Sequence, residues 1–158
     1  MIKAEWKIQL FTKTSNGFEN DGAFKPAVYK EPDNDTVHVF YRAVRMGNDS
    51  SIGYCRLDGA TTRAERIERP ILFPEKKYES QGIEDPRITK IDDTYYLTYS
   101  VYDKVNVLGA YAISKDLKTF KKKGVITPKF TFREYKHLIE CSKGLIDKYL
   151  FHYRIFKE

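Results

Sequence analysis

The sequence predicts an all-β fold, and three features of its 158 residues support this prediction. Aromatic residues make up 15% of the chain, and aromatic and β-branched residues are enriched in strands. Clusters of turn-forming residues recur between the apolar runs. No segment shows the sustained apolar period of about 3.6 residues that an amphipathic helix requires. We therefore expect short strands joined by turns.

Eight segments have the apolar patterning of strands. In chain order they are 27–30, 37–42, 51–56, 88–91, 94–99, 109–114, 121–125 and 148–155. Turn signals separate several of them, at Pro32-Asp33-Asn34-Asp35, Asp58-Gly59 and Asp92-Asp93.

The predicted strands form a repeat with a period of about 54 to 60 residues. Pro26-Ala27-Val28 matches Pro86-Arg87-Ile88, 37–41 matches 95–99, Gly53-Tyr54 matches Ala110-Tyr111, and 71–74 matches 125–128. Four strands in such a period are typical of a β-propeller blade. We expect one partial propeller domain over 1–158, with an N-terminal segment at 1–24, blade-like repeats at 25–80 and 81–140, and the start of a further blade at 141–158.

The composition argues against several classes of protein. The net charge is +6, but the basic residues are interleaved with acids, which does not favour nucleic-acid binding. The densest basic stretch, 118–123, is expected to be a strand edge protected by lysines. No apolar run approaches the ~20 residues of a membrane span, and the N-terminus lacks the apolar core of a signal peptide. We expect a cytoplasmic protein, or a periplasmic or secreted one if a leader has been removed.

The two cysteines, Cys55 and Cys141, lack the spacing of a metal site. We expect them to be small buried apolar residues or free thiols.

The most informative stretch is Gly82-Ile83-Glu84-Asp85-Pro86-Arg87. Proline fixes its own φ near −65° and disfavours helical backbone at the residue before it. We therefore expect an extended Asp85 whose carboxylate direction is set by the backbone. A catalytic acid is best held in this way, on a rigid element.

This stretch resembles the signature of glycoside hydrolase family 130. The resemblance continues, in the family's order, through Phe40-Tyr41-Arg42-Ala43, Ser51-Ile52-Gly53-Tyr54 before Asp58-Gly59, 99–103, Ile113-Ser114-Lys115-Asp116 and Phe151-His152-Tyr153-Arg154. It implies a five-bladed β-propeller enzyme that cleaves β-mannosides with inversion, by phosphorolysis with inorganic phosphate as co-substrate or by hydrolysis. It also implies that the enzyme needs neither a metal nor an organic cofactor.

The family's enzymes are about twice as long as this chain, which implies a fragment or one half of a split protein. A propeller closes its ring, so that a partial ring leaves exposed strand edges. Such edges predict pairing with a second copy or with a chain that carries the missing blades.

The resemblance implies that Asp85 is the general acid and passes its proton to the glycosidic oxygen through a hydroxyl of the mannose ring. Inversion requires one such acid, with the nucleophile on the opposite face of the sugar. Glu84 ranks second, and we expect it to hold the start of the strand through backbone N–H groups. Arg87 is expected to form an ion pair with one of the two acids. Glu84 and Arg87 are also candidate residues of the substrate or phosphate site.

Four further residues are candidate ligands of substrate or phosphate. Arg42 and Arg154 resemble the family's anion- or sugar-binding arginines, since guanidinium groups form paired hydrogen bonds with phosphate or vicinal hydroxyls. Asp103 resembles a ligand of substrate hydroxyls, and Lys136 lies at about the family's separation from Arg154. Tyr99 and Tyr102 are expected to pack rather than to stack on a sugar. The family's phosphorylases commonly carry Asn-Pro where this chain has Lys25-Pro26.

Two other functions are compatible with the sequence. A five-bladed glycosidase of another family needs an acid early in the first blade, and neither Asp21 nor Asp35 has that strand context. A carbohydrate-binding propeller fragment without catalysis would need only Arg42, Asp103 and aromatic faces.

Overall fold

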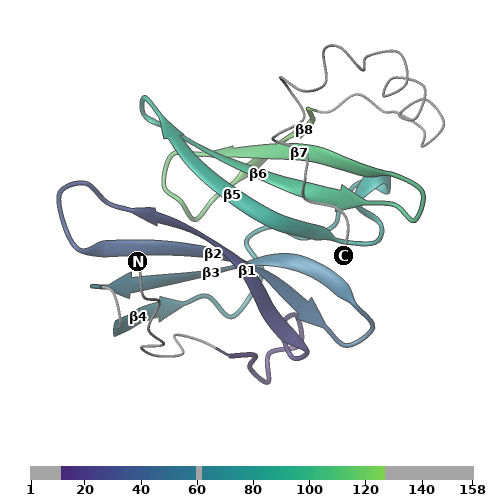
Figure 1. The fold of residues 1–158 in the computed structure, drawn as a ribbon, viewed down its shortest axis with the longest axis horizontal. Helices are drawn as coiled ribbons and strands as arrows, with labels where there is room; N and C mark the ends of the chain where they lie inside the picture. Colours follow the sequence, from purple (N-terminus) through teal and green to yellow (C-terminus); the bar gives the residue numbers. More distant parts are fainter. Residues whose placement is uncertain (1–11, 60–61, 127–158) are drawn as a thin grey trace, which may run out of the picture. The chain divides into compact units, whose positions relative to one another are not determined.

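The computed structural model describes residues 12–59 and 62–126. Their strands form two four-stranded antiparallel sheets (Figure 1). The first sheet has the order β1 (Gly22–Lys30), β2 (Thr36–Arg45), β3 (Asp49–Asp58) and β4 (Thr62–Arg66). The second has the order β5 (Ile83–Ile91), β6 (Thr94–Tyr102), β7 (Val107–Ser114) and β8 (Lys121–Val125). A single 3₁₀ turn, η1 (Lys77–Glu79), lies in the described connection between the sheets. This arrangement confirms the predicted all-β fold.

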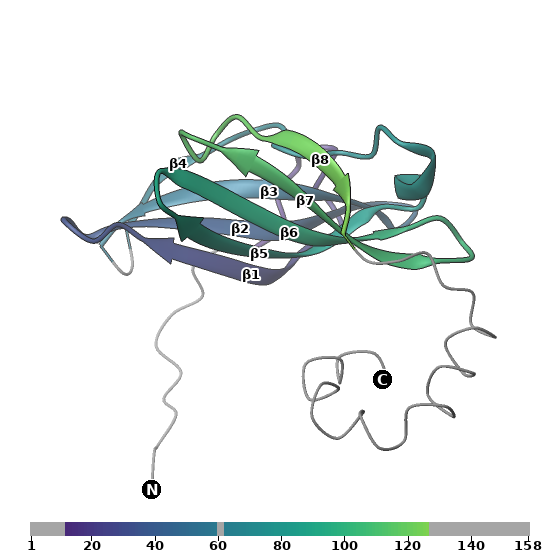
Figure 2. The ribbon, with the colours of Figure 1, turned by 90° about the horizontal axis from the view of Figure 1, so that it is seen from above.

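The two sheets stack face to face, with β5 packed against β1, β2 and β3 (Figures 1 and 2). Strand β6 shows how the sequence directs this packing, because its residues alternate between buried and half-buried positions along its length. The core between the sheets includes Phe40, Ile52 and Tyr54 from the first sheet and Leu97, Tyr99 and Ala110 from the second. The strand period of two thus gives each sheet an apolar face toward the other sheet, and these two faces bury each other. The first sheet also carries a second buried apolar cluster on its opposite face.

Seven of the eight predicted strands lie within observed strands. Strand β4 was not predicted, because it is a short edge strand rich in charged residues. The predicted strand at 148–155 lies outside the described residues, and so does Cys141. Cys55 is buried, as predicted, in a second apolar cluster with Val39 and Leu57. The division into repeats at 25–80, 81–140 and 141–158 stays a prediction.

Strands β1 and β5 begin earlier than predicted, at Gly22 and Ile83. The sequence places their starts at Ala27 and Ile88, directly after a proline or one residue later. In the structure both prolines lie inside the strands, at shifts in strand register between Phe24 and Ala27 and between Glu84 and Arg87. A bulge accommodates a proline because the residue there is not required to donate a ladder hydrogen bond.

None of the helices in the described part of the chain is long and apolar enough to span a membrane.

Gly53 is expected to be indispensable for the packing of the first sheet. It pairs with Tyr41 across β2 and β3, and a Cβ atom at Gly53 would collide with Cζ of Tyr41. We predict that Gly53→Ala lowers the free energy of unfolding by about 1–3 kcal/mol, because the Tyr41 ring must leave its buried position. Denaturant unfolding measures this loss. Gly17→Ala is the control, since a Cβ atom there meets nothing within 4 Å, and equal unfolding midpoints for the two variants would refute the prediction.

Candidate active site

Asp85 lies in a bulge near the start of β5, where the pairing with β6 shifts register between Glu84 and Arg87. Its φ is +52°, in the left-handed region. This corrects the extended backbone predicted from Pro86, because the bulge bends the strand and overrides the usual preference of a residue before proline. The side chain is only 9% exposed. The bulge, rather than a regular strand, therefore sets the direction of the Asp85 carboxylate.

The first sheet has an equivalent bulge at Lys25. The pairing of β1 with β2 shifts between Phe24 and Ala27, and Lys25 has a φ of +47°. Nζ of Lys25 donates a hydrogen bond of 2.9 Å to Oδ2 of Asp85 and forms an ion pair with it. Oδ1 of Asp85 is buried and has no hydrogen-bond partner in the described part of the chain. One carboxylate oxygen is thus held and the other is unsatisfied.

Arg42 and Glu84 form a second ion pair between the sheets. Nη2 of Arg42 lies 2.7 Å from Oε1 of Glu84, and Nε of Arg42 donates to Oγ of Ser50 at 2.9 Å. The hydroxyl of Ser50 donates in turn to Oε1 of Glu84 at 3.4 Å. Glu84 therefore binds side chains of β2 and β3, which corrects its predicted role of holding backbone N–H groups. The role of Arg42 as a ligand of phosphate or sugar stays a prediction.

Arg87 does not form the predicted ion pair with either acid. Its Nη1 donates to the carbonyl oxygen of Pro86 at 2.7 Å, and its side chain is exposed. The bulge explains the difference, because it turns Asp85 toward β1, where Lys25 supplies the positive charge.

Asp103 closes the turn between β6 and β7. Its Oδ1 accepts hydrogen bonds from the backbone N–H groups of Val105, at 3.1 Å, and Asn106, at 2.7 Å. This is the local turn bonding that aspartate favours. Asp103 follows the end of β6 that pairs with Ile83 and Glu84, so it lies at the same end of the second sheet as the two acids. Its predicted role as a substrate ligand stays a prediction.

The two tyrosines differ in exposure. Tyr99 is 3% exposed and belongs to the core between the sheets, as predicted. Burial raises the pKa of its hydroxyl group, which therefore stays neutral. Tyr102 is 38% exposed, and its hydroxyl donates to the carbonyl oxygen of Lys104. The remaining candidates, Lys136 and Arg154, lie outside the described residues.

Two residues of this site were not predicted as site residues: Lys25 and Ser50. The signal for Lys25 lay in the repeat, which matches Pro26 with Pro86 and so gives Lys25 and Asp85 equivalent positions in the two repeats. Ser50 offered no such signal, because a serine near a strand start has many structural roles.

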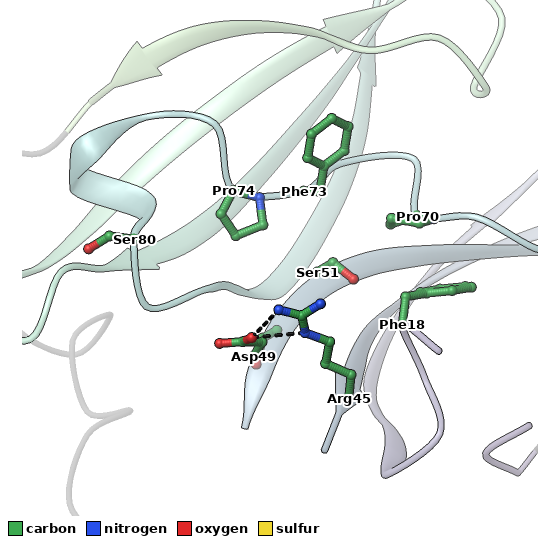
Figure 3. Close-up of a pocket in the computed structure, with 9 residues that line it drawn as sticks. Phe18, Arg45, Asp49, Ser51, Pro70, Phe73, Pro74 and Ser80 are labelled. Atoms are coloured by element: carbon green, nitrogen blue, oxygen red, sulfur yellow. Dashed lines mark hydrogen bonds and ion pairs between the residues drawn. The ribbon is translucent and has the colours of Figure 1, made fainter. Parts of the chain in front are cut away.

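A separate hollow of about 420 Å³ lies on the first sheet, near the connection to η1 (Figure 3). Its lining includes Phe18, Phe73 and Pro74 and the exposed ion pair of Arg45 with Asp49. Ser50 lines it as well, but Lys25 and Asp85 do not. The described residues contain no group of histidines, cysteines and acids that would hold a metal ion.

A second hollow, of about 350 Å³, lies beside the turn at Ser114–Thr119. Backbone N–H groups of Thr119 and Lys118 donate to Oδ1 of Asp116 at 2.7 Å and 2.9 Å. The hydrogen bond from Thr119 is the chief cause that lowers the pKa of Asp116 to about 2. This carboxylate is therefore engaged in its own turn.

Comparison with known proteins places these observations in a family. A family model described as beta-1,4-mannooligosaccharide phosphorylase matches residues 4–157. A 1,2-beta-oligomannan phosphorylase from Thermoanaerobacter sp. (strain X514) is 32% identical over 131 residues, which cover 76% of this chain and 43% of the relative. The chain thus spans less than half the length of this curated relative.

Two solved structures agree with this comparison. A glycosyl hydrolase from Bacteroides ovatus superposes with a TM-score of 0.65 and 26% identity, covering 73% of this chain and 38% of that one. The same figures hold for a structure from work on hydrolases of the family that target beta-1,2 mannosidic linkages in Candida mannan. The described sheets are therefore part of a propeller-type fold. With nearly the whole sequence matched by the family model, the chain belongs to glycoside hydrolase family 130.

Proposed function

We propose that the complete protein cleaves β-mannosidic bonds with inversion by phosphorolysis, and that Asp85 is its general acid. The observation that carries this proposal is the state of the Asp85 carboxylate. It is nine-tenths buried, it is fixed by a bulge, and its Oδ1 lacks a partner in the described part of the chain. A sugar hydroxyl placed against Oδ1 would supply the missing hydrogen bond.

The reaction follows from this placement. An oxygen of inorganic phosphate attacks the anomeric carbon while the bond from that carbon to the glycosidic oxygen breaks. The glycosidic oxygen takes the electron pair and a proton, which Asp85 supplies through a hydroxyl of the mannose ring. The products are α-mannose 1-phosphate and a shortened mannoside.

Phosphorolysis is preferred to hydrolysis because the curated relative at 32% identity is a phosphorylase. In a hydrolase a second carboxylate, about 6.5–9.5 Å from the acid, would activate water instead. Glu84 does not suit this role, since Arg42 and Ser50 already engage its Oε1. We propose that phosphate is held by Arg42 and Arg154, with Lys136 nearby, and that further blades of a longer protein or of a partner chain complete the site.

The decisive assay is release of sugar 1-phosphate from β-1,2- and β-1,4-linked mannosides, with and without inorganic phosphate. It compares this 158-residue chain with the longest product of its gene. We expect phosphate-dependent release of mannose 1-phosphate from the complete protein. Release of free mannose without phosphate would replace phosphorolysis by hydrolysis. Binding of mannosides without turnover by the complete protein would favour a carbohydrate-binding propeller.

A further inference from the structure

Lys25 and Asp85 share an unusual backbone conformation. Six non-glycine residues in the described part of the chain have a positive φ, and four of them lie at turns: Asn48, Asp92, Lys104 and Leu117. Lys25 and Asp85 are the two that lie inside strands. A left-handed residue within a strand is strained unless its surroundings hold it, and such strain gathers at functional sites. The two bulges therefore form a matched pair, one in each sheet.

We propose that Lys25 is a positioning residue of the active site: it holds Oδ2 of Asp85 across the two sheets and leaves Oδ1 as the oxygen that meets a substrate hydroxyl. This inference rests on the proposed function. Its geometric basis is the 2.9 Å contact between Nζ of Lys25 and Oδ2 of Asp85. A carboxylate with one oxygen bound to a fixed cation has a defined orientation for the other.

The burial of the pair is asymmetric. The side chain of Asp85 is 9% exposed and that of Lys25 is 50% exposed. The ammonium group therefore stays hydrated on one side and approaches Asp85 from the side that solvent reaches. Oδ1 is buried without a partner among the described residues, and a buried polar oxygen in this state requires a hydrogen-bond partner. A hydroxyl of a bound sugar provides that partner and accepts the proton when the acid reacts.

Among the charged side chains near Asp85, Lys25 is the cation that contacts its carboxylate. From β2, Arg42 is bound to Glu84, and from β5 itself Arg87 donates to the Pro86 carbonyl. Strand β3 contributes the uncharged hydroxyl of Ser50, and β6 presents Thr98 and Ser100 opposite the bulge. Lys25 is thus the cation that contacts the Asp85 carboxylate.

The same strand provides a matched control. Lys30 and Asp35 also form an ion pair, at 3.0 Å, but their side chains are 60% and 83% exposed. This pair has the same two residue types and nearly the same distance, without burial or strain. A surface pair of this kind contributes little to stability or to any site.

The test measures kcat on a mannobiose and on β-mannosyl fluoride for the complete protein and its variants Lys25→Met, Lys25→Arg and Lys30→Met. For Lys25→Met we expect kcat on the mannobiose to fall about 10- to 100-fold, because the acid is misplaced. We expect activity on the fluoride to fall much less, because its leaving group needs no proton from Asp85. Lys25→Arg should recover part of the loss on the mannobiose, and Lys30→Met should change neither activity.

The outcomes separate this inference from the proposed function. If the unaltered complete protein turns over no β-mannoside, the proposed function fails and the positioning role fails with it. If that protein is active and Lys25→Met keeps its kcat on the mannobiose, the proposed function stands and the positioning role of Lys25 is refuted. A Lys25→Met protein that loses activity on the mannobiose and on the fluoride equally would also refute it, because equal losses describe a merely structural residue.

Discussion

Asp85→Asn in the complete protein is expected to lower turnover of unactivated β-mannosides by about 10²–10⁴-fold, the usual contribution of a general acid. The amide has nearly the shape of the carboxyl group and still offers an oxygen to Lys25, whose hydrogen bond to Asp85 is 2.9 Å long. It cannot donate an acidic proton. The loss should therefore appear in kcat, while mannoside binding measured by calorimetry stays within a few-fold of the original value.

A substrate with an activated leaving group sharpens this prediction. β-Mannosyl fluoride needs no proton on its leaving group, so Asp85→Asn should retain much more of its activity on the fluoride than on a mannobiose. A variant that is merely misfolded would lose both activities equally. Activity retained on the fluoride therefore separates loss of the acid from loss of the fold.

Asp35→Asn is the control for this experiment. Asp35 pairs with Lys30 as Asp85 pairs with Lys25, but its side chain is 83% exposed. Turnover by the Asp35→Asn variant should match that of the unaltered protein. Turnover by Asp85→Asn within a few-fold of this control would remove Asp85 from the role of general acid and would direct attention to Glu84.

The sequence predicted the strands well because their signals are local. Alternation of apolar residues specifies which face of a strand is buried, and turn residues specify where it ends. Strand β6 was predicted at 94–99 and extends over Thr94–Tyr102. The three residues beyond the predicted end lie next to the turn that Asp103 closes.

The candidate site was predicted only in part, because its geometry depends on contacts between sheets. Asp85 was found from a motif, but its cation, Lys25, lies 60 positions away and comes from the other sheet. The sequence neighbour Arg87 was the natural candidate for that partner. The bulge determines which cation Asp85 contacts, since one extra residue in a strand turns a side chain toward a different neighbour. The repeat gives Lys25 and Asp85 equivalent positions, but it does not show that their side chains meet.

The prediction with the largest effect on stability concerns Arg66, which joins an N-terminal segment to the first sheet. Glu19 is fully buried, and its Oε2 accepts hydrogen bonds of 2.7 Å from Nη2 of Arg66 and from the hydroxyl of Tyr41. Nε of Arg66 donates to the Tyr41 hydroxyl oxygen at 3.1 Å, and Nη1 donates to the carbonyl oxygen of Thr12. Burial and the hydrogen bond to Glu19 raise the pKa of Tyr41, so the phenol remains a neutral donor.

Arg66→Met should lower the free energy of unfolding by about 3–5 kcal/mol, because Glu19 is left as a buried charge without its cation. Thermal and denaturant unfolding measure the loss. The double variant Glu19→Gln with Arg66→Met should recover part of it, since no buried charge remains. Arg45→Met is the control: Arg45 and Asp49 form an exposed pair, with side chains 60% and 52% exposed, so its loss should be about 0.2–1 kcal/mol. Equal losses for Arg66→Met and Arg45→Met would show that the buried network contributes no more to stability than a surface ion pair. The expected difference would identify the Glu19–Arg66 pair as the contact that holds residues 12–20 against the first sheet.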